Sequence, residues 1–227
     1  IARWGAVAPR ADPRAGGGCA DKASRAAPVG RWAPRMSTAP QPALTWPPEL
    51  LLRAQGVRVA FFDVDGVLTD GGLYFSAEGE TLKRFHTLDG HGLKLLARAG
   101  ITPCVISGRD SAPLRLRLRA LGVAHLRLGT EDKRPAAEAM LAELGLDWAQ
   151  AAAMGDDWPD LPVLRRVAFA CAPPQAHAEA RALAHHVTAA PAGEGAAREF
   201  CDLLLVAGGH YRRLLAEQLD PPEGGPA

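Results

Sequence analysis

The feature that most constrains this chain is a pair of aspartates that directly follows an apolar run. Asp63 and Asp65 come after the strand-like segment 57–62, and Gly66 follows them in DVDGVLTD. A buried strand of this kind ends at the carboxyl edge of an α/β sheet, where such folds bind their ligands. Side chains alternate along a strand, so both carboxylates are expected on one face. Two carboxylates held together repel each other, and a divalent cation with oxygen ligands relieves that repulsion.

Downstream of this pair, strand-like and helix-like segments alternate. The strand-like runs are 57–62, 101–106, 125–128, 151–154 and 167–170, and the helical patterns lie at about 90–99, 111–121, 135–144 and 161–166. Such alternation is typical of right-handed βαβ units. The sequence therefore predicts an α/β fold with a Rossmann-like, mostly parallel sheet that is covered by helices.

A β-hairpin is predicted directly after the aspartate pair. Its strands are expected at 73–76 and 81–86, on either side of a four-residue link that contains Gly79. A hairpin alone is marginally stable in water. We therefore expect it to lie against its own domain or against a neighbouring subunit.

The two ends of the chain differ in composition from the alternating region. Residues 1–48 are rich in Ala, Pro, Gly and Arg and contain no strand-length apolar run, so we expect them to be disordered or a non-native extension. Met36 is a candidate for the true start, and a transit peptide is the alternative. One domain is expected over 49–210, followed by a flexible tail over 211–227.

Composition excludes several kinds of partner. The net charge is +1, and residues 1–35 hold seven Arg or Lys against two Asp, which leaves about −4 for the rest of the chain. No apolar stretch reaches the roughly 18 residues of a membrane-spanning helix, and the arginines at 115, 117 and 119 cannot all share one helix face. We therefore expect no membrane and no nucleic acid as a partner.

The four cysteines form no C-x2-C pair, which fits reduced thiols and a cytoplasmic location.

Further polar side chains follow the later strand-like runs. Ser107 stands in ISGRD, Lys133 in EDKRP, and Asp156 in MGDDWPD, each just past a strand-like run or at a helix start. Because parallel strands share one carboxyl edge, these side chains are expected to converge on Asp63. Asp157 and Asp160 could ligate a metal or orient Lys133, although a helix start favours acidic residues in any case.

These groups fit phosphoryl transfer from a monoester. A phosphate dianion that approaches a carboxylate to about 4 Å meets a repulsion of roughly 8 kcal/mol at an effective dielectric constant near 20. A Mg²⁺ ion held by Asp63 and Asp156, together with the Lys133 ammonium, can cancel it. Asp63 is then expected to attack phosphorus and form an aspartyl-phosphate, with Asp65 as general acid and base and Ser107 as a hydroxyl donor.

In order and spacing, DVDGVLTD, Ser107, Lys133 and GDDWPD resemble the four signatures of the haloacid dehalogenase superfamily of phosphohydrolases. Within it, residues 57–206, with GGLYFSAEGETLKRFHTLDGHGLKLL and GEGAAREFCDLLL, are similar to the 3-deoxy-D-manno-octulosonate 8-phosphate phosphatase family. The resemblance implies a capless Rossmann-like fold, Mg²⁺ as cofactor, and a role in lipopolysaccharide biosynthesis. It also implies a homotetramer in which the hairpin closes the neighbouring subunit's site.

The resemblance assigns roles to individual positions. Asp63, Asp65 (through its carbonyl) and Asp156 would hold the metal, and Asp63, Asp65, Ser107 and Lys133 would be catalytic. Contacts to the sugar acid and its phosphate would come from His86, Thr87, Leu88, Asp89, Gly90, Arg109, Arg117 and Lys133. Leu88, His86 and Lys94 stand where relatives often have Arg, Asn and Arg. A related sugar phosphate, such as a nonulosonate 9-phosphate, is therefore an alternative substrate.

Two other classes of function share part of this pattern. A signalling receiver domain also uses an aspartyl-phosphate, magnesium, a hydroxyl residue and a lysine, but it has no acid two residues after the phosphorylated aspartate, so Asp65 argues against it. A catalytically silent oligomerisation module is the third hypothesis. The intact Asp63, Lys133 and Asp156 argue against it.

Overall fold

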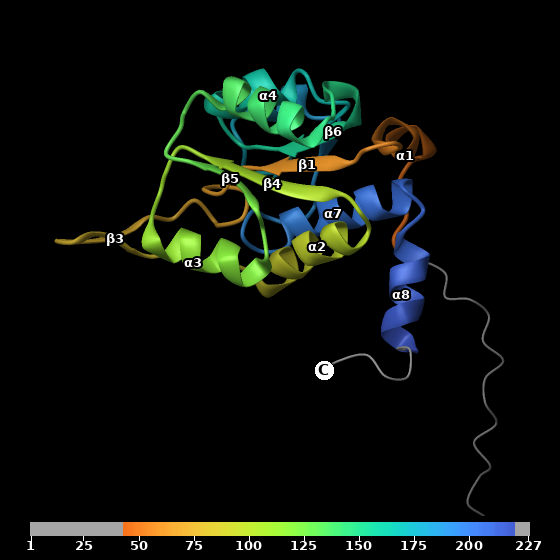
Figure 1. Ribbon diagram of the computed structural model, residues 1–227, viewed down its shortest axis with the longest axis horizontal. Coiled ribbons are helices and arrows are strands. Elements are labelled where there is room, and N and C mark those ends of the chain that lie inside the picture. Colours follow the sequence, from red (N-terminus) through yellow and green to blue (C-terminus); the bar gives the residue numbers. More distant parts are fainter. Residues whose placement is uncertain (1–42, 221–227) are drawn as a thin grey trace, which may run out of the picture. The chain divides into compact units, whose positions relative to one another are not determined.

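The structure, a computed structural model, describes residues 43–220 and is built around one parallel sheet (Figure 1). The sheet has six strands in the order β5-β4-β1-β6-β7-β8, and every neighbouring pair is parallel. The strands are β1 (Val59–Phe62), β4 (Thr102–Ser107), β5 (His125–Leu128), β6 (Ala151–Met154), β7 (Phe169–Ala172) and β8 (His186–Val187). The α/β class with a parallel sheet is thus confirmed.

Helices cover both faces of the sheet (Figure 1). They are α1 (Pro48–Ala54), α2 (Thr87–Arg98), α3 (Ala112–Leu121), α4 (Lys133–Leu144), α5 (Leu161–Leu164), α6 (Ala178–Leu183), α7 (Ala196–Ala207) and α8 (Tyr211–Leu219), with short 3₁₀ turns at Trp148–Gln150 and Trp158–Asp160. Apolar side chains of α2, α3 and α7 form one buried cluster with the sheet. Those of α4, α5 and α6 form a second cluster on the other face.

Strand β1 is apolar along its whole length because it lies between these two clusters. Ala60 and Phe62 pack with the α7 side, whereas Val59 and Phe61 pack with the α4 side. The Phe62 ring meets Phe200 of α7 edge to face, at 5.5 Å between ring centroids. A strand buried on both faces has little freedom to shift, so the residues that follow it are held firmly in place.

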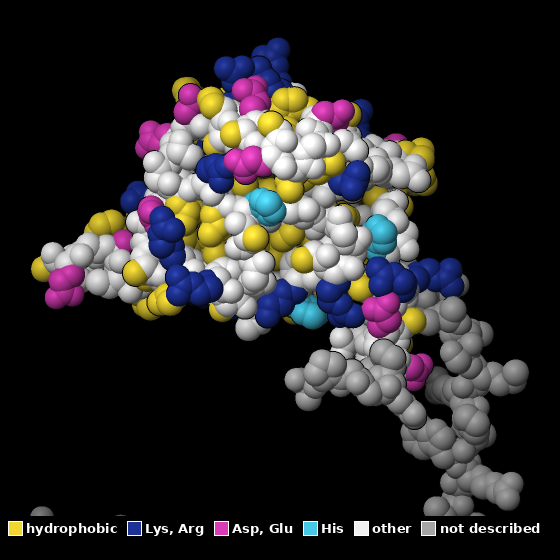
Figure 2. All heavy atoms as spheres, viewed as in Figure 1, with side chains coloured by type: hydrophobic (Ala, Val, Ile, Leu, Met, Phe, Trp, Pro, Cys, Tyr) yellow, Lys and Arg dark blue, Asp and Glu magenta, His cyan; other side chains and the backbone are white. Residues whose placement is uncertain are grey.

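The predicted hairpin is present, with a shorter link than expected. It consists of β2 (Tyr74–Ser76) and β3 (Gly79–Leu82), and Ser76 pairs directly with Gly79. Only Ala77 and Glu78 connect the strands, so Gly79, with φ of 105°, begins the second strand instead of lying inside the link. The hairpin projects from the rest of the described chain, and its end carries hydrophobic and acidic side chains (Figures 1 and 2).

Several short elements were not expected from the sequence. They are α1, α6, β8 and α8, and the last of these covers residues 211–219, where a flexible tail was predicted. Leu214 of α8 is buried, which explains why this amphipathic segment forms a helix. Residues 1–42 and 221–227 lie outside the described part, so the expectations about Met36 and the chain ends, and the domain boundaries as a whole, stay predictions. Within residues 43–220, no helix is long and apolar enough to cross a membrane.

Candidate active site

The polar side chains that follow the strands meet at one cleft. Asp63 follows β1, Ser107 ends β4, Lys133 begins α4, and Asp156 follows β6. The cleft has a volume of about 360 Å³ and is lined by Asp63, Asp65, Ser107, Gly108, Arg109, Glu131, Lys133, Asp156, Asp157, Pro159 and Asp160. The ends of β1, β4 and β6 and the segment between β5 and α4 lie at the carboxyl edge of the sheet, which explains this convergence.

The turn after β1 depends on Gly66. This residue has φ of 88°, in the left-handed region that side chains with a Cβ avoid. A Cβ at this position would also lie 2.1 Å from the Oδ2 atom of Asp156. Glycine therefore lets the turn after Asp63 come close to the carboxylate that follows β6.

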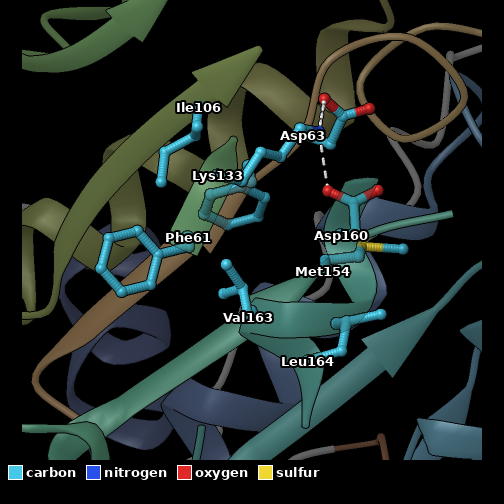
Figure 3. A pocket seen from close by; sticks show the side chains of 10 residues that line it. Phe61, Asp63, Ile106, Lys133, Met154, Asp160, Val163 and Leu164 are labelled. Carbon is cyan, nitrogen blue, oxygen red and sulfur yellow. Dashed lines mark hydrogen bonds and ion pairs between the residues drawn. The ribbon is translucent and has the colours of Figure 1, made fainter. Parts of the chain in front are cut away.

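Lys133 joins two carboxylates beneath the cleft (Figure 3). Its Nζ atom lies 2.6 Å from Oδ1 of Asp63 and 2.7 Å from Oδ1 of Asp160. The lysine is only 5% exposed. Below it lies an apolar floor that includes Phe61, Ile106, Val163 and Leu164.

Asp160 has a clear structural role that the sequence left open. While its Oδ1 atom accepts from Lys133, its Oδ2 atom accepts from the backbone amides of Asp156 and Asp157, at 3.0 and 3.3 Å. Both oxygens of Asp160 are thus engaged. It orients Lys133 and fixes the loop that carries Asp156.

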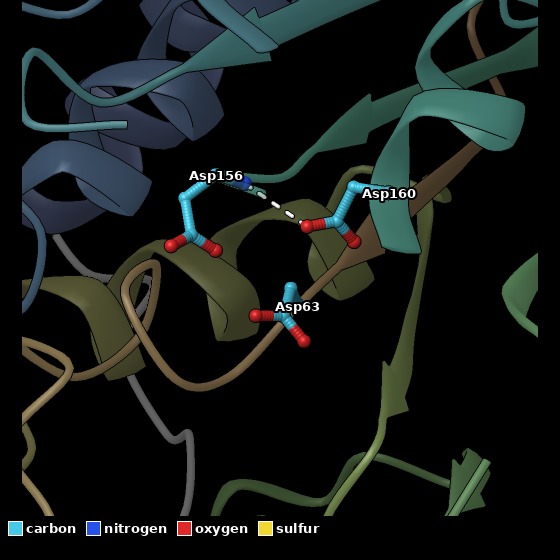
Figure 4. Close-up of side chains that lie close together, drawn as sticks. All are labelled: Asp63, Asp156 and Asp160. Atoms are coloured by element: carbon cyan, nitrogen blue, oxygen red, sulfur yellow. Dashed lines mark hydrogen bonds between the residues drawn. The ribbon is translucent and has the colours of Figure 1, made fainter. Parts of the chain in front are cut away.

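Asp63, Asp156 and Asp160 form a cluster of carboxylates (Figure 4). Each offers an oxygen, and these oxygens lie within 4.8 Å of one another. Burial, reinforced by the charge of Asp160, raises the pKa of Asp63 to about 6 despite the nearby lysine. Burial and the charges of Asp63 and Asp160 raise the pKa of Asp156 to about 8.

Lys133 responds in the opposite sense. Burial alone would lower the pKa of its ammonium, but the charges of Asp63 and Asp160 outweigh burial and raise it. Lys133 is therefore charged at neutral pH. One ammonium faces three carboxylates, which leaves an excess of negative charge that a divalent cation with oxygen ligands would balance.

Asp65 lies in different surroundings from this cluster. Its Oδ1 atom accepts from Nζ of Lys83, a residue that sequence reasoning missed, and from the Thr69 hydroxyl at 3.5 Å. Its Oδ2 atom lies 3.6 Å from Nε of Arg109. The side chains of Asp63 and Asp65 thus have separate partners, although only one residue lies between them.

Ser107 and Arg109 also line the cleft. The Ser107 hydroxyl is buried and accepts from the backbone amide of Arg109 at 3.2 Å. The Arg109 side chain is about half exposed and contacts Asp65. Both residues therefore lie where the sequence placed them, beside the cluster.

None of the described residues 86–90 lines the cleft. His86 caps the start of α2, where its Nδ1 atom accepts from the Leu88 amide at 3.3 Å. Asp89 is buried and accepts from the backbone amides of Gly195 and Arg198, at 3.3 and 2.8 Å, so it caps α7. Within one chain, this geometry does not support Asp89 as a substrate contact.

Arg117 also lies away from the cleft of its own chain. Its guanidinium lies over the Phe85 ring, 5.8 Å from the centroid, and donates to the carbonyl of His86 at 3.3 Å. A Cβ on Gly90 would lie 2.3 Å from the Nη2 atom of this arginine. Gly90 therefore allows α2 and α3 to pack closely around Arg117, and the substrate contacts expected at 86–90 and 117 stay predictions.

Comparisons with known proteins agree with this architecture. A model of the haloacid dehalogenase-like hydrolases matches residues 129–200. The 3-deoxy-D-manno-octulosonate 8-phosphate phosphatase of Yersinia pestis is 40% identical over 159 residues, which are 70% of this chain and 85% of that protein. The enzyme of the same name from Salmonella typhimurium is 37% identical over 162 residues, or 71% of this chain and 86% of that protein.

Solved structures are similar over the same region. A probable YrbI family phosphatase from Pseudomonas syringae is 47% identical with a TM-score of 0.74, and the match covers 76% of this chain and 98% of that one. The 3-deoxy-D-manno-octulosonate 8-phosphate phosphatase of Moraxella catarrhalis, in complex with magnesium, phosphate and KDO, is 34% identical with a TM-score of 0.73 over 75% of this chain and 98% of that one. The chain therefore belongs to the 3-deoxy-D-manno-octulosonate 8-phosphate phosphatase family of the haloacid dehalogenase-like hydrolases.

Proposed function

We propose that this protein hydrolyses 3-deoxy-D-manno-octulosonate 8-phosphate to the free sugar acid and inorganic phosphate, as a step of lipopolysaccharide biosynthesis. The observation that carries the proposal is the buried Asp63, bonded to Lys133 within a cluster of carboxylates at the carboxyl edge of the sheet. Family membership supports it, because relatives at 37–40% identity are named as phosphatases of this substrate.

The donor set fits Mg²⁺. Asp63 and Asp156 offer carboxylate oxygens, the ligands that hard divalent cations prefer. Their pKa values are raised because burial and neighbouring carboxylates disfavour the charged forms, and a bound cation would relieve this effect. Asp63, Asp156 and the carbonyl of Asp65 would hold the ion. When bound, Mg²⁺ supplies positive charge that offsets the phosphate dianion. Asp160 is engaged with Lys133 and two amides, so we assign it to orienting these groups.

Asp63 is the nucleophile of the proposed reaction. One of its carboxylate oxygens attacks phosphorus in line with the ester oxygen, the bond between phosphorus and the sugar oxygen breaks, and an aspartyl-phosphate forms. Lys133 stays charged because its pKa is raised. Its ammonium and the Ser107 hydroxyl stabilise the negative charge on the phosphoryl oxygens.

Asp65 moves the proton. Its protonated carboxyl gives a proton to the departing sugar oxygen, and the resulting carboxylate then removes a proton from a water molecule. The hydroxide oxygen attacks phosphorus, the bond to Asp63 breaks, and Asp63 is restored as a carboxylate. Asp65 lines the cleft but lies outside the carboxylate cluster, which leaves its side chain available for this task.

Recognition of the sugar acid is assigned to the rim of the cleft. Arg109 is exposed there, and its guanidinium is suited to bind the carboxylate of the substrate. Residues 86–90 and Arg117 would reach a substrate only in an assembled form of the protein. With Leu88 where relatives often carry Arg, a nonulosonate 9-phosphate remains the alternative substrate.

The exposed hairpin supports a homotetramer in which each hairpin covers a neighbour's cleft. Its large apolar side chains are exposed, namely Leu73, Tyr74, Phe75 and Leu82, with Phe75 the most exposed at 62%. Such side chains on a projecting hairpin are typical of an interaction surface. A cleft closed by a neighbour would also exclude bulk water during phosphoryl transfer.

A cytoplasmic location agrees with the state of the described cysteines. Cys104, Cys171 and Cys201 are buried and free. Burial raises the pKa of the Cys104 thiol to about 12, so this group is inert. Reduced core thiols are usual in a reducing compartment.

Asp63→Asn is the direct test of the function. The purified protein is expected to release phosphate from the octulosonate 8-phosphate with Mg²⁺ and to lose this activity in a chelator, and the variant is expected to fall to background because an amide cannot attack phosphorus. Asp220→Asn makes the same chemical change at an exposed position far from the cleft and should keep wild-type activity.

Turnover by Asp63→Asn would contradict the nucleophile assignment. Faster release from a nonulosonate 9-phosphate would favour the alternative substrate, and no release from any sugar phosphate would favour the silent module.

Lys133→Ala is expected to lower phosphate release by about 10²- to 10³-fold, the usual effect of losing one preorganised anion donor. Steady-state kinetics with saturating Mg²⁺ measure it. Arg134→Ala is the matched control, because this neighbour in α4 is half exposed and, among residues 43–220, forms an ion pair with Glu138 alone, at 3.8 Å. A loss below threefold in Lys133→Ala would make the lysine a structural residue.

The carboxylate cluster predicts how stability depends on pH without a divalent cation. Asp63 and Asp156 have raised pKa values, so the folded protein keeps protons that the unfolded chain has lost. The free energy of unfolding in a chelator should therefore fall as pH rises from about 4 to about 8. Asp156→Asn should flatten this decline and stabilise the metal-free protein at pH 8, because the amide carries no charge for Asp63 and Asp160 to repel.

Urea unfolding at several pH values, with chelator or Mg²⁺, measures this dependence. Mg²⁺ should stabilise the wild type because it binds the folded state, and Asp156→Asn should lose most of that gain. Equal gains from Mg²⁺ in both proteins would show that Asp156 is not a ligand.

Phe75→Asp tests the proposed assembly. The charge should weaken an interface at the hairpin and reduce both the mass measured by light scattering and the activity towards the sugar phosphate. Leu219→Asp introduces the same charge at a similarly exposed position of α8 and serves as the control. A wild-type monomer with full activity would refute the neighbour-closed site.

A further inference from the structure

A buried lysine connects the hairpin with Asp65. Lys83 follows β3 directly and is only 7% exposed, yet it does not line the cleft. Its Nζ atom donates to Oδ1 of Asp65 and lies 2.9 Å from Oε1 of Glu80, a residue of β3. The side chain of Glu80 is also buried. The lysine therefore has two carboxylate partners, Asp65 and Glu80.

We infer that Lys83 is a positioning residue for Asp65, which fixes one carboxylate oxygen so that the other faces the substrate and exchanges the proton. The inference rests on the proposed function, because it concerns the general acid and base of that reaction. Lys83 itself touches neither substrate nor metal in this account. It acts through Asp65 alone.

The two oxygens of Asp65 have different partners, and this difference carries the inference. Oδ1 accepts from Lys83 and from the Thr69 hydroxyl, at the side of the hairpin. Oδ2 lies 3.6 Å from Nε of Arg109, which lines the cleft. An exposed carboxylate with no such partner rotates freely, and a displacement of about 1 Å at a catalytic group can cost 10²-fold in rate.

Glu80 keeps Lys83 in this place. Its Oε1 atom accepts from the hydroxyl of Ser111 at 3.1 Å as well as from the lysine. Ser111 stands at the N-cap of α3, so the network ties β3 to that helix. Burying a lysine is costly unless its charge is paired, and the carboxylates of Asp65 and Glu80 satisfy this need.

Stability alone is the competing explanation for this network. A buried ion pair is weak evidence for stabilisation, since an apolar group of similar volume often serves as well. The two explanations differ in the chemistry that they affect. Loss of a group that positions the general acid should slow only those reactions in which the leaving group needs a proton.

The experiment compares two phosphate esters with different leaving groups. The sugar oxygen of the octulosonate 8-phosphate leaves as a strongly basic alkoxide and needs the proton from Asp65, whereas p-nitrophenolate is a weak base and leaves without it. Rapid-mixing measurements with enzyme in excess report the first step for both esters, in which the bond from phosphorus to the ester oxygen breaks and Asp63 becomes phosphorylated.

Lys83→Met is expected to slow cleavage of the sugar phosphate by about 10²-fold, the lower end of the usual general-acid contribution. Cleavage of p-nitrophenyl phosphate should slow less than threefold. Lys83→Arg keeps a cation and should recover part of the loss. Arg84→Met is the control, because this next residue is exposed and makes only surface pairs, with Asp70 and Glu194.

Equal losses with both esters, or no loss with either, would overturn the inference. If Lys83→Met does not fold, the double variant Glu80→Gln/Lys83→Met removes both buried charges and carries the same expectation. If the wild type cleaves other alkyl phosphates but not the octulosonate 8-phosphate, the proposed substrate is wrong. The alkyl phosphate that is cleaved fastest then replaces the octulosonate 8-phosphate in the comparison with p-nitrophenyl phosphate, and the same comparison tests the role of Lys83.

Discussion

The ion pairs of Lys133 with Asp63 and Asp160 are the interaction on which this site depends. They lie over an apolar floor and under a cleft, where electrostatic interactions are stronger than in water. One ammonium cannot neutralise three carboxylates, so the cluster is short of positive charge, as the raised pKa values of Asp63 and Asp156 show. A phosphate dianion could enter such a cleft only together with a divalent cation, whose positive charge offsets both the carboxylates and the phosphate.

The sheet makes such a cluster possible. Its strands β1 and β6 are paired in register, and the amide of Asp63 extends that pairing by donating to the carbonyl of Met154 at 3.1 Å. Asp63 and Asp156 therefore start from adjacent, fixed points. Gly66 adds the second condition, since any side chain there would displace the Asp156 carboxylate. Carboxylates brought together by a rigid backbone cannot separate to relieve their repulsion, and they remain ready for a cation.

The sequence could predict the parts of this arrangement that follow from local pattern. An apolar run that ends in DVDG predicts the buried β1 and its edge, and the order of Ser107, Lys133 and Asp156 predicts their convergence. Bonds between distant segments leave no such pattern. Asp160 joins Lys133 across 27 positions and Lys83 joins Asp65 across 18, and nothing in either local sequence selects its partner.

Asp89 has a second role that its motif did not indicate. The family resemblance assigns it a substrate contact, which stays a prediction, and within its own chain its carboxylate caps a helix 109 positions away, at the Arg198 amide. A polar residue inside such a motif can thus cap a helix as well as serve the chemistry. The short elements α6 and β8 were missed for a related reason, because six and two residues are too few to display a hydrophobic period.

The hairpin combines exposed apolar side chains with a buried ion pair. Phe75 and Leu82 are exposed, whereas the side chain of Glu80, which pairs with Phe75 across the hairpin, is buried together with Lys83, and Lys83 is bonded to Asp65. A two-stranded hairpin is marginally stable alone, so contacts made by its exposed side chains would strengthen the whole element. Because Lys83 lies directly beyond β3, any partner that orders the hairpin would also order the group that holds Asp65. In the assembly proposed above, subunit contacts and proton transfer would then depend on the same short segment.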